Sequence, residues 1–188
     1  YQPTLFPQVN GFKKAWISYY GEMEALAKEI MEVFAVALGL ETDYFNEFIN
    51  YPISALRALN YPPIKNFKNK DQQRAGAHTD YGSLTILLPE PKSTGLQIFW
   101  HGKWIDVPST DDCFIINIGD LMELWTSNRW FSTLHRVIAQ PNQPGRLSLA
   151  FFHQPDWDAE INPIFNEAQE KSVKSGPYLM KKFLSATN

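Results

Sequence analysis

The feature that most constrains the fold is a change of character after Ile53. From there, short runs rich in β-branched and aromatic residues alternate with turn signals. The run Trp100-His101-Gly102-Lys103-Trp104 predicts a tight hairpin with His101 in its turn, whereas His153 is expected to be an ordinary strand residue. The predicted strands lie near residues 54–61, 84–89, 95–100, 103–108, 113–118, 132–139 and 146–153. Many short strands favour two sheets closed into a jelly roll, because closure removes exposed sheet edges.

Helices are predicted on both sides of this strand-rich region. Apolar residues recur at helical spacing from Phe12 to Leu38, and Gly39 is expected to end that helix. Thr42 is expected to cap a short second helix that reaches Phe48, and residues 175–186 predict a final amphipathic helix. We therefore expect a mainly β fold with flanking helices. In one domain, residues 1–188, the helical support of 12–48 and the C-terminal helix of 175–186 flank a jelly-roll core of 54–155.

Composition limits the classes of partner. The net charge of −3 gives no sign of a basic surface for nucleic acid or an anionic membrane, and the apolar runs are too short to span a bilayer. The single cysteine, Cys113, cannot form an internal disulfide, so we expect a reducing cytoplasm and a buried, inert thiol. The chain starts at Tyr1 without a methionine, and we expect it to lack its N-terminal portion.

The most informative triplet for function is His78-Thr79-Asp80. On an extended strand, residues two apart point to the same face, so an imidazole and a carboxylate would converge on one point. His135 lies in another predicted strand and can supply a second imidazole. Two histidines and one carboxylate leave positions free on an octahedral metal, which suits iron(II) oxygen chemistry, whereas a structural zinc site is closed by four protein ligands.

A cation follows in the last predicted strand. Arg146 and Ser148 would face the same side, where a guanidinium and a hydroxyl can hold the far carboxylate of a dianionic chelator. Taken singly, His135 is more often a core histidine and a strand arginine is usually a surface residue. The order and spacing of these residues together favour a metal site with an anion-binding partner.

The complete pattern resembles the isopenicillin N synthase-like family of iron(II)/2-oxoglutarate dioxygenases, over about residues 12–178. The motifs that carry the resemblance are Gly76-Ala77-His78-Thr79-Asp80-Tyr81-Gly82-Ser83-Leu84-Thr85, Gly95-Leu96-Gln97, Trp104, Asn117-Ile118-Gly119-Asp120, Ser132-Thr133-Leu134-His135-Arg136-Val137 and Arg146-Leu147-Ser148. The resemblance implies a double-stranded β-helix, or jelly roll, with helices packed outside the major sheet. Family members usually carry further residues before the helix that starts here near Phe12.

The resemblance also implies roles for individual residues. His78, Asp80 and His135 match the iron(II) ligands, while Arg146 and Ser148 match the pair that binds 2-oxoglutarate. Two further positions match less specific family features. Tyr61 matches a tyrosine that often contacts the cosubstrate, and Phe152 matches an aromatic residue that lines the substrate pocket in several members. For Phe152, plain core packing is an equal alternative. Leu59 stands where many plant members have a cosubstrate-binding asparagine.

The implied function is oxidative decarboxylation of 2-oxoglutarate by dioxygen, coupled to hydroxylation or desaturation of a small organic molecule. The protein would position the reactants and shield them from water. An apolar lining of the reaction space, which would provide this shielding, could be formed by Ile86, Leu88, Phe114 and Ile116. Ordinary core packing explains these four residues equally well.

Alternatives remain open at this point. Isopenicillin N synthase and the plant ethylene-forming oxidases share the metal motifs and the arginine–serine pair without consuming 2-oxoglutarate, and the sequence separates them poorly. A non-catalytic small-molecule binding module on the same scaffold is a third possibility. A cupin-type site is disfavoured because no third histidine is placed to complete it.

Overall fold

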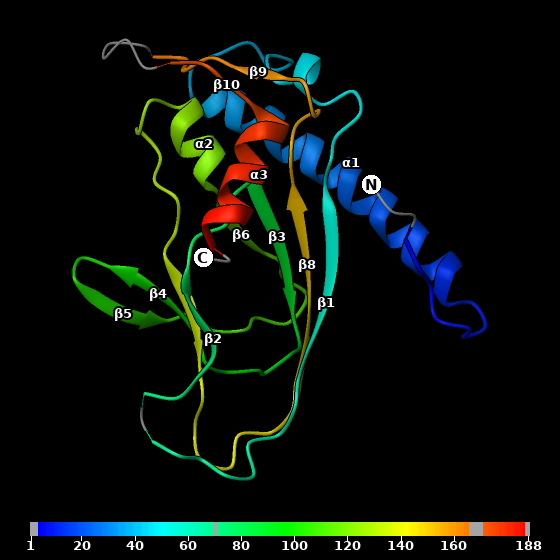
Figure 1. Ribbon diagram of the computed structural model, residues 1–188, viewed down its shortest axis with the longest axis vertical. Helices are drawn as coiled ribbons and strands as arrows, with labels where there is room; N and C mark the ends of the chain where they lie inside the picture. The colour runs from blue at the N-terminus through cyan, green and yellow to red at the C-terminus, as the bar shows by residue number, and fades with distance from the viewer. Residues whose placement is uncertain (1–3, 70, 166–170, 187–188) are drawn as a thin grey trace. The chain divides into compact units, whose positions relative to one another are not determined.

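The computed structural model describes residues 4–69, 71–165 and 171–186, which are drawn in colour in Figure 1. The chain forms two compact units, residues 1–47 and residues 48–188. None of the helices in the described part is long and apolar enough to cross a membrane.

The first unit contains the long helix α1, Phe12–Ala37. Its buried residues are Met23, Ala27, Met31 and Ala35, which are spaced by four and therefore form one stripe. Gly39 has φ 75°, a left-handed conformation that costs glycine little, so the predicted helix end is confirmed. The short second helix is only partly present: residues 42–45 form turns, and a 3-10 helix, η1, spans Asn46–Phe48.

The second unit contains most of the strands predicted from the sequence. Strands β3 and β8 and helix α3 have the predicted bounds, and the other predicted strands are shorter by one to four residues. The elements in chain order are β1 (Ala55–Tyr61), β2 (Gln73–His78), β3 (Leu84–Pro89), β4 (Leu96–Trp100), β5 (Lys103–Asp106), β6 (Ile115–Ile118), α2 (Asp120–Trp125), β7 (His135–Ile138), β8 (Arg146–His153), β9 (Glu160–Ile161), β10 (Val173–Lys174) and α3 (Ser175–Ala186).

The strands form two four-stranded sheets, ordered β1-β8-β3-β6 and β2-β7-β4-β5, and β9 pairs separately with β10 (Figure 1). Every pairing between these strands is antiparallel, and neighbours in each sheet are mostly distant in sequence. This arrangement confirms the predicted jelly roll. The hairpin of β4 and β5 is also confirmed, with His101 at φ 47° in its turn.

The two sheets pack against each other through a small apolar core. Leu87 and Ala150 of the first sheet cluster with Leu96 and Val137 of the second, and Leu59 packs on them. Because successive side chains of a strand point to opposite faces, Leu87 faces the second sheet while Ile86, which is also buried, faces away from it.

Three elements were not predicted. Strand β2 consists of small and polar residues and has no β-branched side chain, so its sequence gives no strand signal. Helix α2 is only six residues long, too short for a helical period to be visible. The third is the short ribbon of β9 and β10. Cys113 was predicted to be buried and is exposed, because it precedes the first residue of β6 rather than lying within that strand.

His153, at the end of β8, is confirmed as a strand residue and is almost fully buried. Its Nδ1 lies 2.7 Å from the hydroxyl of Ser83. Burial disfavours the charged imidazolium and lowers the pKa of His153 to about 4, from an ordinary value of 6.5. The unfolded chain therefore binds a proton below about pH 6.5 that the folded chain does not take up until about pH 4.

We expect the free energy of unfolding of the metal-free protein to fall by about 2 kcal/mol between pH 7 and pH 5 through His153 alone. His153→Gln should lose this component of the pH dependence, because glutamine does not titrate. Urea unfolding at both pH values measures it. His101→Gln, a change of an exposed turn residue, should keep the wild-type dependence; a His153→Gln variant with the wild-type slope would contradict the assignment.

Candidate metal centre

Two histidines face each other across neighbouring strands. His78, the last residue of β2, is the register partner of His135, the first residue of β7. Their ring centroids are 4.3 Å apart. The register of this pair shifts between Ala75 and His78, and such an irregularity commonly re-aims a side chain beside a functional site. The pairing of two strands thus brings together two imidazoles that are distant in sequence.

Each imidazole is oriented by a backbone carbonyl. Nδ1 of His78 lies 2.6 Å from the carbonyl oxygen of Gly76, and Nδ1 of His135 lies 2.8 Å from that of Thr133. A carbonyl can only accept, so each Nδ1 carries the proton and donates it. Each Nε2 therefore has a free lone pair, which is the arrangement that metal-binding histidines commonly show.

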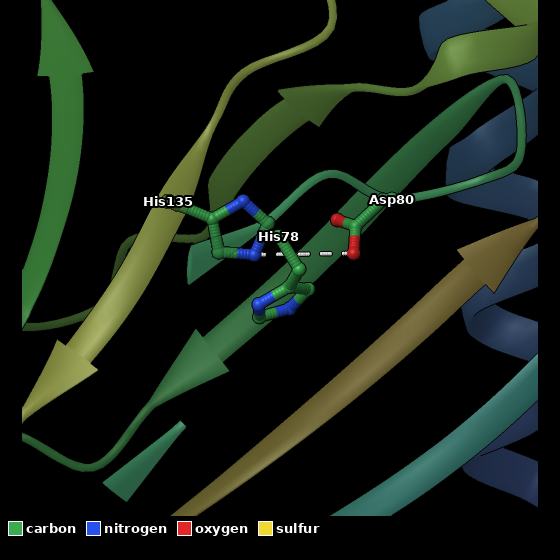
Figure 2. Close-up of side chains that lie close together, drawn as sticks. All are labelled: His78, Asp80 and His135. Carbon is green, nitrogen blue, oxygen red and sulfur yellow. Dashed lines mark ion pairs between the residues drawn. The ribbon is translucent and has the colours of Figure 1, made fainter. Parts of the chain in front are cut away.

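Asp80 completes the cluster from a turn rather than from a strand. The sequence analysis placed His78 and Asp80 on one extended strand, but β2 ends at His78 and residues 81–83 form a bend. Asp80 Oδ1 lies 3.9 Å from His135 Nε2, and Figure 2 marks this pair with a dashed line. Asp80 Oδ2 is buried and has no hydrogen-bond partner among the described residues.

Backbone hydrogen bonds fix this turn on the start of α2. The backbone N–H groups of Gly119, Asp120 and Leu121 donate to the carbonyl oxygens of Ser83, Asp80 and Gly82, at 3.0, 2.8 and 3.1 Å. Gly119 itself lies so close to the turn that a side chain there would overlap the carbonyl group of Gly82. The Asn117-Ile118-Gly119-Asp120 motif thus fixes the position of the backbone that carries the Asp80 carboxylate.

The cluster fits a metal ion. One ligand atom from each of His78, Asp80 and His135 lies within 4.8 Å of the other two. Asp80 and His135 are buried, so a buried carboxylate oxygen without a partner lies beside two oriented lone pairs. An uncompensated buried carboxylate is costly, and a cation removes that cost. The donor set of two imidazoles and one carboxylate suits iron(II) and leaves positions for further ligands.

A single cavity of about 70 Å³ between the two sheets, called here the inner cavity, is lined by all seven predicted site residues. The three donors lie at one side of it. Tyr61 and Arg146 are register partners on β1 and β8, and the Arg146 guanidinium lies 4.9 Å from the Tyr61 ring centroid. The predicted site residues around the cavity are Tyr61, His78, Asp80, His135, Arg146, Ser148 and Phe152.

Arg146 is held in a buried position with unused hydrogen-bonding capacity. It is 5% exposed, and its Nη1 donates to the carbonyl oxygen of Thr94 at 3.1 Å. Its Nε has no partner among the described residues. Burial lowers the pKa of Arg146, and nearby Tyr61 counteracts this, but an arginine starts so high that it stays protonated. A buried cation with an unpaired donor beside a metal site is suited to an anionic ligand.

Three residues that line the cavities were not predicted from the sequence, and the predicted apolar lining lies on the wrong face of two strands. Thr85 and Asn117, which are register partners on β3 and β6, line the inner cavity, and the Thr85 hydroxyl is buried without a partner among the described residues. Arg57 lines a second cavity described below. The predicted apolar lining was wrong, because Ile86, Leu88, Phe114 and Ile116 are absent from it. Thr85 and Leu87, one residue away from Ile86, face the cavity instead.

Comparison with known families agrees with this geometry. Residues 48–155 match the family model of the 2OG-Fe(II) oxygenase superfamily. The chain belongs to this superfamily. The superfamily is defined by Fe(II) and 2-oxoglutarate, and the residues around the inner cavity fit both. Iron(II) would be held by His78, Asp80 and His135.

Individual members of the superfamily resemble the chain over nearly its whole length. The 2-oxoglutarate-dependent dioxygenase traH of Penicillium crustosum is 34% identical over 96% of this chain and 56% of its own length. A 1-aminocyclopropane-1-carboxylate oxidase of Cucumis melo is 36% identical over 88% of this chain and 52% of its own. A full-length Neurospora crassa protein, solved in complex with alpha-KG, has a TM-score of 0.91 and 34% identity, covering 97% of this chain and 65% of that one. The chain spans about half the length of the curated relatives it matches.

We expect Gly119→Ala to weaken metal binding although Gly119 is not a ligand. The added Cβ would overlap the Gly82 carbonyl and lie 3.2 Å from the carbonyl oxygen of Asp80, so the turn that carries the carboxylate must move. Overpacking of this kind costs about 1–3 kcal/mol of stability. Calorimetric titration with Zn(II) and urea unfolding measure both effects.

Gly76→Ala is the matched control, because its Cβ would meet only Gln73 Oε1 at 3.8 Å. It lies two residues from His78 and should keep both metal affinity and stability near the wild-type values. Equal behaviour of the two variants would show that the contact between Gly119 and the turn does not position Asp80.

Proposed function

We propose that the chain is the catalytic core of an Fe(II)- and 2-oxoglutarate-dependent dioxygenase that hydroxylates or desaturates a small organic molecule. The observation that carries this proposal is the inner cavity, where a donor triad and a buried, partly unpaired arginine line the same space. We also propose that residues 1–188 belong to one oxygenase domain, since the Neurospora crassa structure aligns with 97% of them. With its single cysteine, the chain suits the reducing cytoplasm.

In this proposal, some residues bind the metal and the cosubstrate, and others exclude water from the site. Bound iron(II) supplies the chemistry by which 2-oxoglutarate and dioxygen become succinate and carbon dioxide while the substrate is oxidised. His78, Asp80 and His135 hold the metal through two neutral imidazoles and one carboxylate. Arg146 and Ser148, which are 5% and 4% exposed, bind the far carboxylate of 2-oxoglutarate, and Tyr61 contacts the same cosubstrate. Phe152 separates this space from the substrate side and excludes water.

The ligands of the solved relatives support a small-molecule substrate. The same Neurospora crassa protein has been solved with thymine and with 5-formyluracil, and JOX2 with 2OG, Fe and JA. A second candidate is an oxidase that does not consume 2-oxoglutarate, because several 1-aminocyclopropane-1-carboxylate oxidases are 32–37% identical to the chain. Arg146 is compatible with both candidates, because the oxidases of the second class share the arginine–serine pair, and succinate formation separates the two.

We expect His78→Ala and Asp80→Ala to abolish Fe(II) binding at micromolar metal, because each removes one of the three donors. Arg146→Ala should leave metal binding in place and weaken 2-oxoglutarate binding at least about tenfold, since it removes a charge-assisted hydrogen bond. Anaerobic calorimetry measures both. His101→Ala, a change in an exposed hairpin turn, is the control and should bind as the wild type does.

Product analysis separates the candidate functions. Succinate that forms only with Fe(II), 2-oxoglutarate and dioxygen would support the proposal. Oxygen uptake without succinate would favour the second candidate, and no oxygen uptake over a broad substrate panel would favour a binding module. Unchanged iron affinity in both His78→Ala and Asp80→Ala would rule out the metal site itself.

A further inference from the structure

A second cavity, of about 230 Å³, is lined by two of the three donors, His78 and Asp80, and is called here the outer pocket. His78, Asp80 and Phe152 line both cavities, so the proposed metal site lies between them. The rest of the outer pocket is largely apolar, with Ile53 before β1 and with Leu179 and Phe183 on α3. The Phe183 ring lies edge-on to Tyr81, 5.6 Å between centroids, which ties α3 to the turn after Asp80.

Arg57 is the one lysine or arginine among the residues that line the outer pocket in the described part of the chain. It lies on β1 between Ala55 and Leu59, and all three point inward because they alternate along the strand. The Arg57 residue is exposed, and its guanidinium lies 5.6 Å from the ring centroid of Phe152, which also lines the pocket. Among the described residues no carboxylate forms an ion pair with Arg57.

Arg57 and Arg146 lie too far apart to bind the same small ligand, and they face different cavities. Arg57 is opposite Ala150 on β8, whereas Arg146 is opposite Tyr61, four residues further along β1. At about 3.4 Å per residue, the two positions are separated by roughly 14 Å along the strand. Arg146 faces the inner cavity and Arg57 faces the outer pocket. One cosubstrate molecule held at Arg146 leaves Arg57 available to another anion.

We propose that the outer pocket takes a substrate that is an organic monoanion, with its carboxylate held by Arg57 and its apolar body against Leu179, Phe183 and Phe152. This inference rests on the proposed function. The planar guanidinium matches a carboxylate through two parallel hydrogen bonds. One cation balances one negative charge, so a phosphate dianion would leave charge uncompensated in an apolar pocket.

The test compares an acid with its neutral analogue on the same protein. The wild type, loaded with Zn(II) to prevent turnover, is titrated calorimetrically with phenylacetate and with phenylacetamide, with and without saturating 2-oxoglutarate. We expect the acid to bind at least about tenfold more tightly than the amide. Arg57→Gln should abolish this preference, and Arg57→Lys should restore part of it because the charge returns. Lys103→Gln removes a charge from the exposed β5 hairpin and should leave the preference unchanged.

Several results would overturn the substrate class. These are equal affinity for acid and amide, no binding of the acid by the wild type, a preference that survives in Arg57→Gln, or an equal loss of acid and amide binding in that variant. The proposed function is judged separately, by whether 2-oxoglutarate binding requires the metal. If it does not, the same titrations on the metal-free protein, where no metal can bind the acid, still decide whether Arg57 selects the acid.

Discussion

The structure of the site depends on the pairing of β2 with β7. This pairing makes His78 and His135 register partners, and the carbonyls of Gly76 and Thr133 then fix which nitrogen of each ring stays free. Asp80 gains its place only because the strand ends at His78 and the next residues are bonded to the start of α2. A slip of one residue in the register would send one imidazole to the opposite face of the sheet, and the three donors would no longer meet.

The alternation of side chains along the strands distributes the remaining roles. On β8 the inward residues are Arg146, Ser148, Ala150 and Phe152, and on β1 they are Ala55, Arg57, Leu59 and Tyr61. β1 and β8 are paired along their whole length, and residues of both strands line both cavities. Phe152 lines both of them, which lets one ring shape the boundary between cosubstrate and substrate.

Sequence patterns predicted much of this arrangement, and the exceptions have physical causes. Strands rich in aliphatic and aromatic residues, such as β3 and β8, were predicted with their bounds, and the seven predicted site residues surround one cavity. Strand β2 was missed because residues such as Ala75 and Gly76 carry no strand preference and depend on their partner strand. The inward face of β3 was misjudged because Leu84–Pro89 is buried on both faces, which hides the alternation. Arg57 was missed because only the tertiary fold places it beside a donor triad.

Charge balance connects the two cavities. By formal counting, iron(II) with two neutral imidazoles and Asp80 leaves one net positive charge, and 2-oxoglutarate brings two negative charges. Arg146 offsets the surplus, so the loaded inner cavity is close to neutral. Arg57 is an exposed cation that lines the largely apolar outer pocket, where the carboxylate of the proposed substrate would pair with it. With Arg146 assigned to the cosubstrate, Arg57 is the remaining positively charged side chain among the described residues that line the two cavities, which is why the proposed substrate anion is assigned to it.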